Sequence, residues 1–187
     1  MVNASELREG MIIKREGKLY KVIEAETKAR TAQFSSYTHL KLQDLKTGHV
    51  HDLRLSPDEK IENVDIEEIE MEYSYADGDN FYFIHPETFE IIELPGYTIG
   101  DFKRYMKEGV KLKIQVYEGN PVSVVIPEFV DLKVVTTGEG IKGGTDSTWK
   151  SATLENGMEI LVPQFIKEGD IVRVSTKTNQ YLERVHK

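Results

Sequence analysis

The sequence predicts an all-β protein made of several small barrels. Short runs of alternating apolar and polar residues recur along the 187-residue chain, with turn-forming residues between them. Their spacing is about 8 to 12 residues, which is typical of small barrels rather than of a parallel sheet with helices between its strands. Only one segment has apolar residues at helical spacing. We therefore expect strands almost throughout the chain.

The first predicted strands lie in the N-terminal third. Apolar and polar residues alternate over 19–24, after a turn at Gly17, and again over 39–42 and 50–55. A period of two is the pattern of a half-buried strand. Lys46-Thr47-Gly48 supplies a turn between the second and third of these runs. We expect these two strands to form a hairpin.

A hairpin with an aromatic inner face is predicted at the start of the middle third. Four apolar residues occupy every second position of one strand, with glutamates and Ser74 on the opposite face: Ile69, Met71, Tyr73 and Tyr75. Asp77-Gly78-Asp79 then turns the chain into the apolar run 81–84. Aromatic side chains on facing strands stabilise such a pair.

The rest of the middle third predicts one helical segment and a second hairpin. Three apolar residues within 98–108 recur at helical spacing: Ile99, Phe102 and Tyr105. Residues 112–116 and 122–126 alternate as strands around the turn Gly119-Asn120. The helical segment therefore lies between two hairpins.

The last third repeats the β pattern. Strands are predicted at 132–135, on either side of Asn156-Gly157, and at 171–174 and 181–185 around the polar turn 177–179. A segment of about 60 residues buries only about 60% of its unfolded surface, so three such segments should pack end to end. SH3-like and OB-type barrels are compact folds of this size.

Composition excludes several classes of protein. The chain has no cysteine, which excludes a disulfide framework, a thiolate nucleophile and a cysteine-ligated zinc site. The longest apolar stretches, such as 122–126, are far shorter than the roughly 18 residues of a membrane span, and no apolar segment of a signal peptide follows Met1. We expect a soluble cytoplasmic protein without membrane contact.

The net charge of −8 is unevenly distributed. Residues 1–64 hold 11 Lys/Arg against 10 Asp/Glu, residues 65–128 hold 5 against 14, and residues 129–187 hold 8 against 8. We take these three ranges as the predicted domains. An acidic protein is a poor partner for nucleic acid, but here the acidity is confined to the centre, where a solvated strand face is the simpler interpretation. A nucleic-acid partner is therefore not excluded.

No motif supports an enzyme. Residues 138–143 match the spacing G-x-G-x-x-G, but turn-forming residues follow where a dinucleotide site needs a helix. His39, His49 and His51 could face one another across a hairpin, yet no carboxylate is placed to complete a metal site, and we expect them to face solvent. We predict no catalytic residue, no cofactor and no metal.

The segment 27–37 differs from the rest of the chain. It joins two predicted strands and contains Lys28 and Arg30 but no Asp or Glu. A projecting loop without negative charge suits contact with a polyanion. The alternative is an ordinary polar hairpin loop.

The C-terminal third resembles the signature of bacterial elongation factor P. The matching positions are Lys150, Ala152, Gly157, Ile160, Val162-Pro163, Ile166 and Gly169. Residues 17–22 and 41–48 resemble the first domain of that family, and residues 71–78 and 87–90 resemble its second domain. Its third domain is resembled by residues 130–132 and 140–143, together with Tyr181 and Arg184. The resemblance implies three small barrels in an L shape the size of a tRNA, an N-terminal SH3-like (KOW-type) barrel followed by two OB-fold barrels.

The resemblance also implies a function. Members of this family bind the ribosome between the P and E sites and stimulate peptide-bond formation when consecutive prolines stall it. A loop of the first domain reaches the acceptor end of the P-site peptidyl-tRNA and restrains it, so the gain is mainly entropic. The expected partners are the ribosome, with its RNA and proteins, and that tRNA. We expect a monomer whose acidic centre imitates tRNA in outline.

The loop departs from the family pattern. Arg30-Thr31-Ala32-Gln33-Phe34 occupies the place of the usual Lys-Pro-Gly-Lys-Gly. Counting back from Lys41 puts Gln33 at the position of the modified lysine, and counting forward from Tyr20 puts Ala32 there. Because neither is a lysine, we expect an unmodified tip.

Two alternatives remain open at this point. Thr31-Ala32-Gln33 also resembles the Thr-Ala-Arg tip of the elongation-factor-P-like paralogue, which has a narrower range of stalling motifs. A non-ribosomal OB/SH3 binding module is the second alternative.

In the third domain, 143–145 reads Gly-Gly-Thr in place of the usual Gly-Asp-Thr, so a codon contact through that aspartate does not carry over.

The resemblance and the loop together give the candidate site residues. Contact with the tRNA acceptor end is expected from Gln33 as the tip and from its neighbours Ala32, Thr31 and Arg30. Contacts with the RNA backbone are expected from Lys28, Lys142, Lys150 and Arg184.

Overall fold

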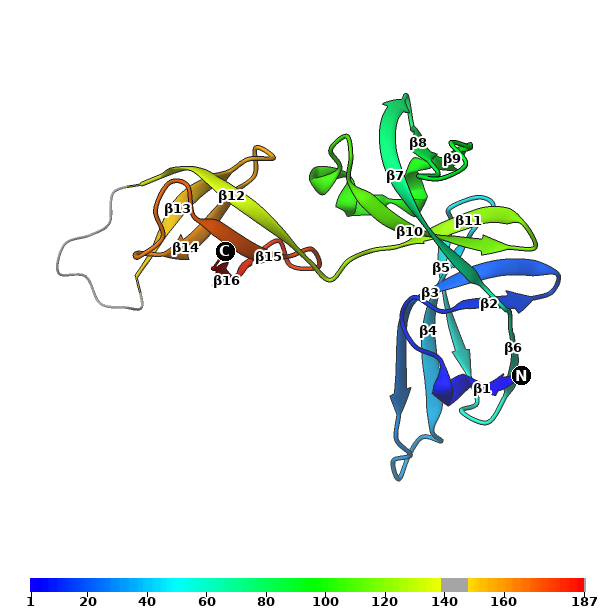
Figure 1. The fold of residues 1–187 in the computed structure, drawn as a ribbon. Helices are drawn as coiled ribbons and strands as arrows, with labels where there is room; N and C mark the ends of the chain where they lie inside the picture. Colours follow the sequence, from blue (N-terminus) through cyan, green and yellow to red (C-terminus); the bar gives the residue numbers. More distant parts are fainter. Residues whose placement is uncertain (139–147, 187) are drawn as a thin grey trace. The chain divides into compact units, whose positions relative to one another are not determined.

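The computed structural model describes residues 1–138 and 148–186 (Figure 1). These residues form two compact units, one of 1–100 with 108–125 and one of 101–107 with 126–187. Three antiparallel sheets make up the described chain, and its helical segments are short 3-10 helices. The predicted all-β class is therefore confirmed. None of the described helices is long and apolar enough to cross a membrane.

The first sheet contains the hairpin predicted in the N-terminal third. Its strand order is β1 (Val2–Asn3), β6 (Lys60–Asn63), β2 (Ile12–Arg15), β3 (Lys18–Lys28), β4 (Tyr37–Asp44) and β5 (Val50–Leu55). A 3-10 helix, η1 (Ala4–Glu6), follows β1. Alternate residues of β4 are buried, as a half-buried strand requires. The core of this sheet is formed by Ala4, Leu7, Ile13, Val22, Leu40, Leu42, Leu55 and Ile61.

Strands β3 and β4 continue past this core as a two-stranded ribbon. They pair from Tyr20 opposite Asp44 to Lys28 opposite Tyr37, with a bulge between Val22 and Glu24. The last three residues of β3 are exposed. Figure 1 shows the two strands running together to the loop that joins them. The ribbon therefore carries residues 29–36 away from the core of its own sheet.

The second sheet contains both hairpins predicted in the middle third. Its strand order is β11 (Asn120–Val125), β10 (Lys111–Tyr117), β7 (Glu67–Asp77), β8 (Asn80–Ile84) and β9 (Ile91–Pro95). Met71, Phe81 and Phe83 are buried. Tyr73 packs against both phenylalanine rings, at centroid distances of 5.8 Å each. The predicted aromatic inner face is present for these residues.

Tyr75 departs from that prediction. A bulge in β7 between Tyr73 and Tyr75 shifts the alternation by one residue, and Tyr75 is half exposed. Its ring stacks on that of Tyr82 with the centroids 4.5 Å apart. A bulge adds one unpaired residue and thereby moves the following side chain to the opposite face. The placement of Tyr75 on the inner face was therefore wrong.

The predicted helical segment is a pair of 3-10 helices, η2 (Gly96–Thr98) and η3 (Gly100–Tyr105). Ile99, Phe102 and Tyr105 are all buried and recur at a spacing of three. A 3-10 helix has three residues per turn, so Phe102 and Tyr105 lie on one face of η3, whereas Ile99 lies between the two helices. Gly100 adopts a φ of +58°, which separates the two helices.

The first two sheets are joined within one compact unit. The ammonium of Lys21 in β3 donates to the Ser123 hydroxyl (2.9 Å) and to the Val124 carbonyl (2.6 Å), both in β11. The Tyr97 hydroxyl donates to the carbonyl of Leu45 at 2.8 Å. Burial lowers the pKa of Lys21 to about 8. These bonds fix the base of the β3–β4 ribbon against the second sheet.

The third sheet has the strand order β14 (Glu159–Pro163), β13 (Trp149–Leu154), β12 (Phe129–Thr137), β15 (Ile171–Ser175) and β16 (Tyr181–Val185). Residues 101–107 belong to the same unit. The Tyr105 hydroxyl donates to Asn179 Oδ1 at 2.6 Å, and the Asn156 amide donates to the Arg104 carbonyl at 3.0 Å. The buried residues of this sheet include Val134, Ala152, Leu154, Ile160, Val162, Ile166, Val172 and Val174.

Candidate functional site

The loop between β3 and β4 ends in a closed four-residue turn. The Thr31 N–H donates to the Phe34 carbonyl (2.9 Å), and the Phe34 N–H donates to the Thr31 hydroxyl oxygen (3.1 Å). Ala32 and Gln33 lie between them at the apex. All residues from 29 to 36 are exposed. The structure thus brings the four predicted contact residues, Arg30 to Gln33, to the end of one projecting ribbon.

The two cations of the loop differ in their surroundings. Arg30 is exposed and immediately precedes the turn. Lys28 forms an ion pair with Glu26, its ammonium 2.5 Å from the carboxylate. This hydrogen bond and the charge of Glu26 raise the pKa of Lys28. Lys28 is therefore charged but partly neutralised, so Arg30 carries the more available positive charge.

A further cation lies at the base of the loop. The guanidinium of Arg54 in β5 stacks over the ring of Tyr37, 4.8 Å from its centroid. Tyr37 is the first residue of β4 and pairs with Lys28. Sequence reasoning did not single out Arg54, although the predicted hairpin of 39–42 with 50–55 already placed it beside β4. Arg54 therefore joins Lys28 and Arg30 around the loop.

The three histidines have separate neighbours. His39 Nε2 lies 3.0 Å from a carboxylate oxygen of Asp52. The His51 ring makes an edge contact with Tyr20 at a centroid distance of 5.4 Å, and His49 is exposed in the turn before β5. Among the residues that the structure describes, no group of three potential ligands could hold a metal ion.

The predicted RNA contacts of the third domain lie on separate strands. Lys150 is half-buried in β13 and pairs with Val162. Arg184 is exposed in β16, and its guanidinium lies 5.4 Å from the centroid of the Phe165 ring. Lys142 lies outside the described residues, as do 139–143 of the glycine-rich motif and 143–145. Lys150 and Arg184 belong to the second compact unit, whereas the loop belongs to the first.

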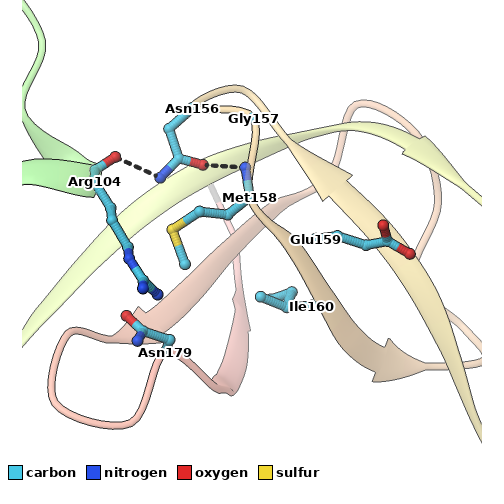
Figure 2. A pocket seen from close by; sticks show the side chains of 7 residues that line it. All are labelled: Arg104, Asn156, Gly157, Met158, Glu159, Ile160 and Asn179. Carbon is cyan, nitrogen blue, oxygen red and sulfur yellow. Dashed lines mark hydrogen bonds between the residues drawn. The ribbon is translucent and has the colours of Figure 1, made fainter. Parts of the chain in front are cut away.

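A shallow hollow of about 450 Å³ is the other candidate site. Figure 2 shows that Asn156 bridges two backbone groups beside it: its amide donates to the Arg104 carbonyl, and its Oδ1 accepts from the Met158 N–H. Glu159 accepts a hydrogen bond from Ser151. The bond to Arg104 holds 101–107 to the third sheet, and the other two bonds lie within the β13–β14 hairpin. The lining residues are Arg104, Asn156, Gly157, Met158, Glu159, Ile160 and Asn179.

Comparison with known families gives three consecutive matches. Residues 3–61 match "Elongation factor P (EF-P) KOW-like domain", residues 66–124 match "Elongation factor P (EF-P) OB domain", and residues 130–184 match "Elongation factor P, C-terminal". The matches follow the order of the three sheets. The three ranges together span almost the whole chain.

Three curated relatives are similar along their full length. Elongation factor P of Moorella thermoacetica is 37% identical and that of Coprothermobacter proteolyticus 36%, over 98% and 99% of this chain and 100% of each relative. The Aquifex aeolicus protein of the same name is 34% identical over 98% of this chain and 96% of its own length.

Proposed function

Because the chain belongs to the elongation factor P family and is thus a translation elongation factor rather than an enzyme, we propose that it positions peptidyl-tRNA on stalled ribosomes. The resemblance predicted from the sequence is confirmed by the full-length relatives. In the proposed function the protein binds in the cytoplasm between the ribosomal P and E sites. The protein then stimulates peptide-bond formation at sites where consecutive prolines slow this reaction.

The β3–β4 ribbon with its closed tip is the observation that carries this proposal. The turn between Thr31 and Phe34 is already ordered by two hydrogen bonds. A preformed tip loses little conformational freedom on binding, so more of its interaction energy is left to restrain the tRNA. Restraining a reactant in its attacking geometry accelerates the reaction without any covalent step. A protein without catalytic groups can act in this way.

The residues at the tip have different roles in this proposal. Gln33 is neutral, and its carboxamide can donate two hydrogen bonds to the acceptor end of the tRNA. Arg30 contacts phosphate, with Arg54 and the partly neutralised Lys28 behind it. Ala32 and Thr31 shape the apex. On the third domain, contacts with the RNA backbone are assigned to Lys142, Lys150 and Arg184.

The charge distribution supports the same assignment. Lys and Arg residues gain from releasing the counterions of RNA, whereas carboxylates are repelled by phosphate. The net charges of +1, −9 and 0 in the three ranges therefore favour RNA contact at the two ends of the chain. The acidic central range, 65–128, is not suited to that contact.

The test is a reconstituted translation reaction with a reporter that contains three consecutive prolines. Adding the protein should shorten the stall, with a reporter lacking prolines as the control. No relief of the stall would refute the proposed function. Co-sedimentation with ribosomes should weaken as salt increases. Absence of binding even at low salt would favour the non-ribosomal binding module instead.

A second candidate function is that of the elongation-factor-P-like paralogue. The observation in its favour is the sequence Thr31-Ala32-Gln33 at the tip. Ribosome profiling of a deletion strain separates the two. If this protein is the paralogue, its loss should lengthen pauses at a narrower set of motifs. If it is the factor for polyproline stalls, its loss should lengthen pauses at consecutive prolines generally.

A further inference from the structure

Phe34 is a large apolar side chain at the end of the projecting loop. It is 68% exposed, although its backbone is fixed by both hydrogen bonds of the turn. Any residue except proline could make these two bonds, because they use only the N–H and carbonyl groups of Phe34. Turns of this kind favour Gly, Asn, Asp and Ser. The folding of the loop therefore does not explain an aromatic side chain here.

The surroundings of Phe34 restrict what its ring can bind. The segment 27–37 contains no carboxylate, and Gln33 and Arg30 lie on the same turn. The aromatic ring pairs of the described residues do not include Phe34. An apolar pocket of a protein would not require the absence of acids. A nucleotide fits both features, because its base has a flat apolar face and its phosphate carries a negative charge.

We propose that Phe34 stacks on an unpaired nucleobase at the acceptor end of ribosome-bound tRNA. Arg30 then reaches the phosphate beside that base, and Gln33 donates to the sugar or base edge. This inference rests on the proposed function, because it specifies what the loop contacts. Stacking on an aromatic ring is tolerant of base identity, which suits a factor that must act on any tRNA.

Four substitutions of Phe34 test the stacking. The measurement is the dissociation constant for ribosomes that carry a stalled peptidyl-tRNA. Phe34→Trp and Phe34→Tyr keep a flat ring and should bind as the wild type does or more tightly. Phe34→Ala and Phe34→Leu should each weaken binding roughly five- to 150-fold, the range for loss of one base stack. Unchanged melting temperatures should accompany all four, because the side chain is exposed.

Phe34→Leu is the decisive variant, because it keeps the apolar surface and removes only the flat ring. Wild-type binding by Phe34→Leu together with weak binding by Phe34→Ala would show an apolar protein pocket as the occupant and overturn the proposal. Wild-type binding by both would show that the ring contacts nothing. Either result contradicts stacking.

Photo-crosslinking identifies the occupant independently of stall relief. A photoreactive p-benzoylphenylalanine in place of Phe34 should crosslink to the 3′-terminal nucleotides of the P-site tRNA. The matched control has the same group in place of Phe89, which is 75% exposed but lies in the second sheet region. Crosslinks only to ribosomal protein, or none, would overturn the inference. Crosslinks to tRNA without any stall relief by the wild type would refute the proposed function while sustaining the stacking.

Discussion

Thr31 and Phe34 hold each other across the tip of the β3–β4 ribbon through one backbone hydrogen bond of 2.9 Å and one side-chain hydrogen bond of 3.1 Å. The second bond depends on the Thr31 hydroxyl oxygen, which accepts from the Phe34 N–H. Ala32 and Gln33 are thereby presented in one conformation. The tip is therefore already ordered in the free protein, and mutations of the bonded residues can test that order.

Removing the Thr31 hydroxyl should loosen the tip. Thr31→Val keeps the shape of the side chain but has no acceptor for the Phe34 N–H. One hydrogen bond contributes about 1 kcal/mol, so stall relief should fall about fivefold, while the melting temperature should fall by no more than about 2–4 °C. Thr31→Ser keeps the hydroxyl and is the matched control. Equal activity of both variants would mean that the bond does not order the tip.

Gln33 should contribute through hydrogen bonds and not through charge. Gln33→Ala removes both donors and should reduce stall relief about fivefold. Gln33→Glu replaces them with a carboxylate that phosphate repels, so its loss should be larger. The three-proline reporter measures both. If Gln33→Ala is harmless while Arg30→Ala abolishes relief, the assignment of Gln33 as the tip fails.

The loop should carry no covalent modification. Neither Ala32 nor Gln33, the two candidate tip positions, is a lysine, and Lys28, the one lysine of the segment 27–37, is ion-paired with Glu26. The intact mass of protein from its native source should therefore equal the sequence mass after N-terminal processing. A protein made in a heterologous host serves as the reference. Added mass on a peptide covering 29–36 would contradict this prediction.

The sequence predicted the strands well where one face is buried in the core. Leu40 and Leu42 alternate with polar residues, and the structure buries both. The bulge that exposes Tyr75 was not predicted, because it depends on how β7 pairs with the neighbouring strand β8. The helical segment was predicted but its 3-10 form was not; Phe102 and Tyr105 are three residues apart in η3, which is one turn of a 3-10 helix.

The loop itself was identified from its missing carboxylates, yet its chemistry needed the structure. Glu26 lies one residue outside the acid-free segment, so its ion pair with Lys28 was missed. Arg54 is distant in sequence and reaches Tyr37 only through the pairing of β4 with β5. The exposure of Phe34 could not be predicted, since an aromatic residue between two strands is more often buried.

The Lys21 bonds between the first two sheets should give the protein a characteristic alkaline pH dependence. In the unfolded chain Lys21 titrates near its ordinary pKa of 10.5, and burial lowers the pKa in the folded protein to about 8. Between these values the unfolded state binds more protons, so the free energy of unfolding contributed by Lys21 rises with pH. Below about pH 8 both states are protonated, and the cost of burying the charge is fully present.

Urea unfolding of the wild type and of Lys21→Met, each at pH 7 and pH 9.5, isolates this contribution. The free energy of unfolding of the wild type should rise relative to that of Lys21→Met as the pH rises. The other titrating groups are shared by both proteins, so their effects cancel in this comparison. The opposing effect comes from the hydrogen bonds to Ser123 and Val124, which favour the charged ammonium, and from the negative charge of Glu9. If these interactions outweigh desolvation, the difference will stay constant or reverse, and the lowered pKa will be refuted.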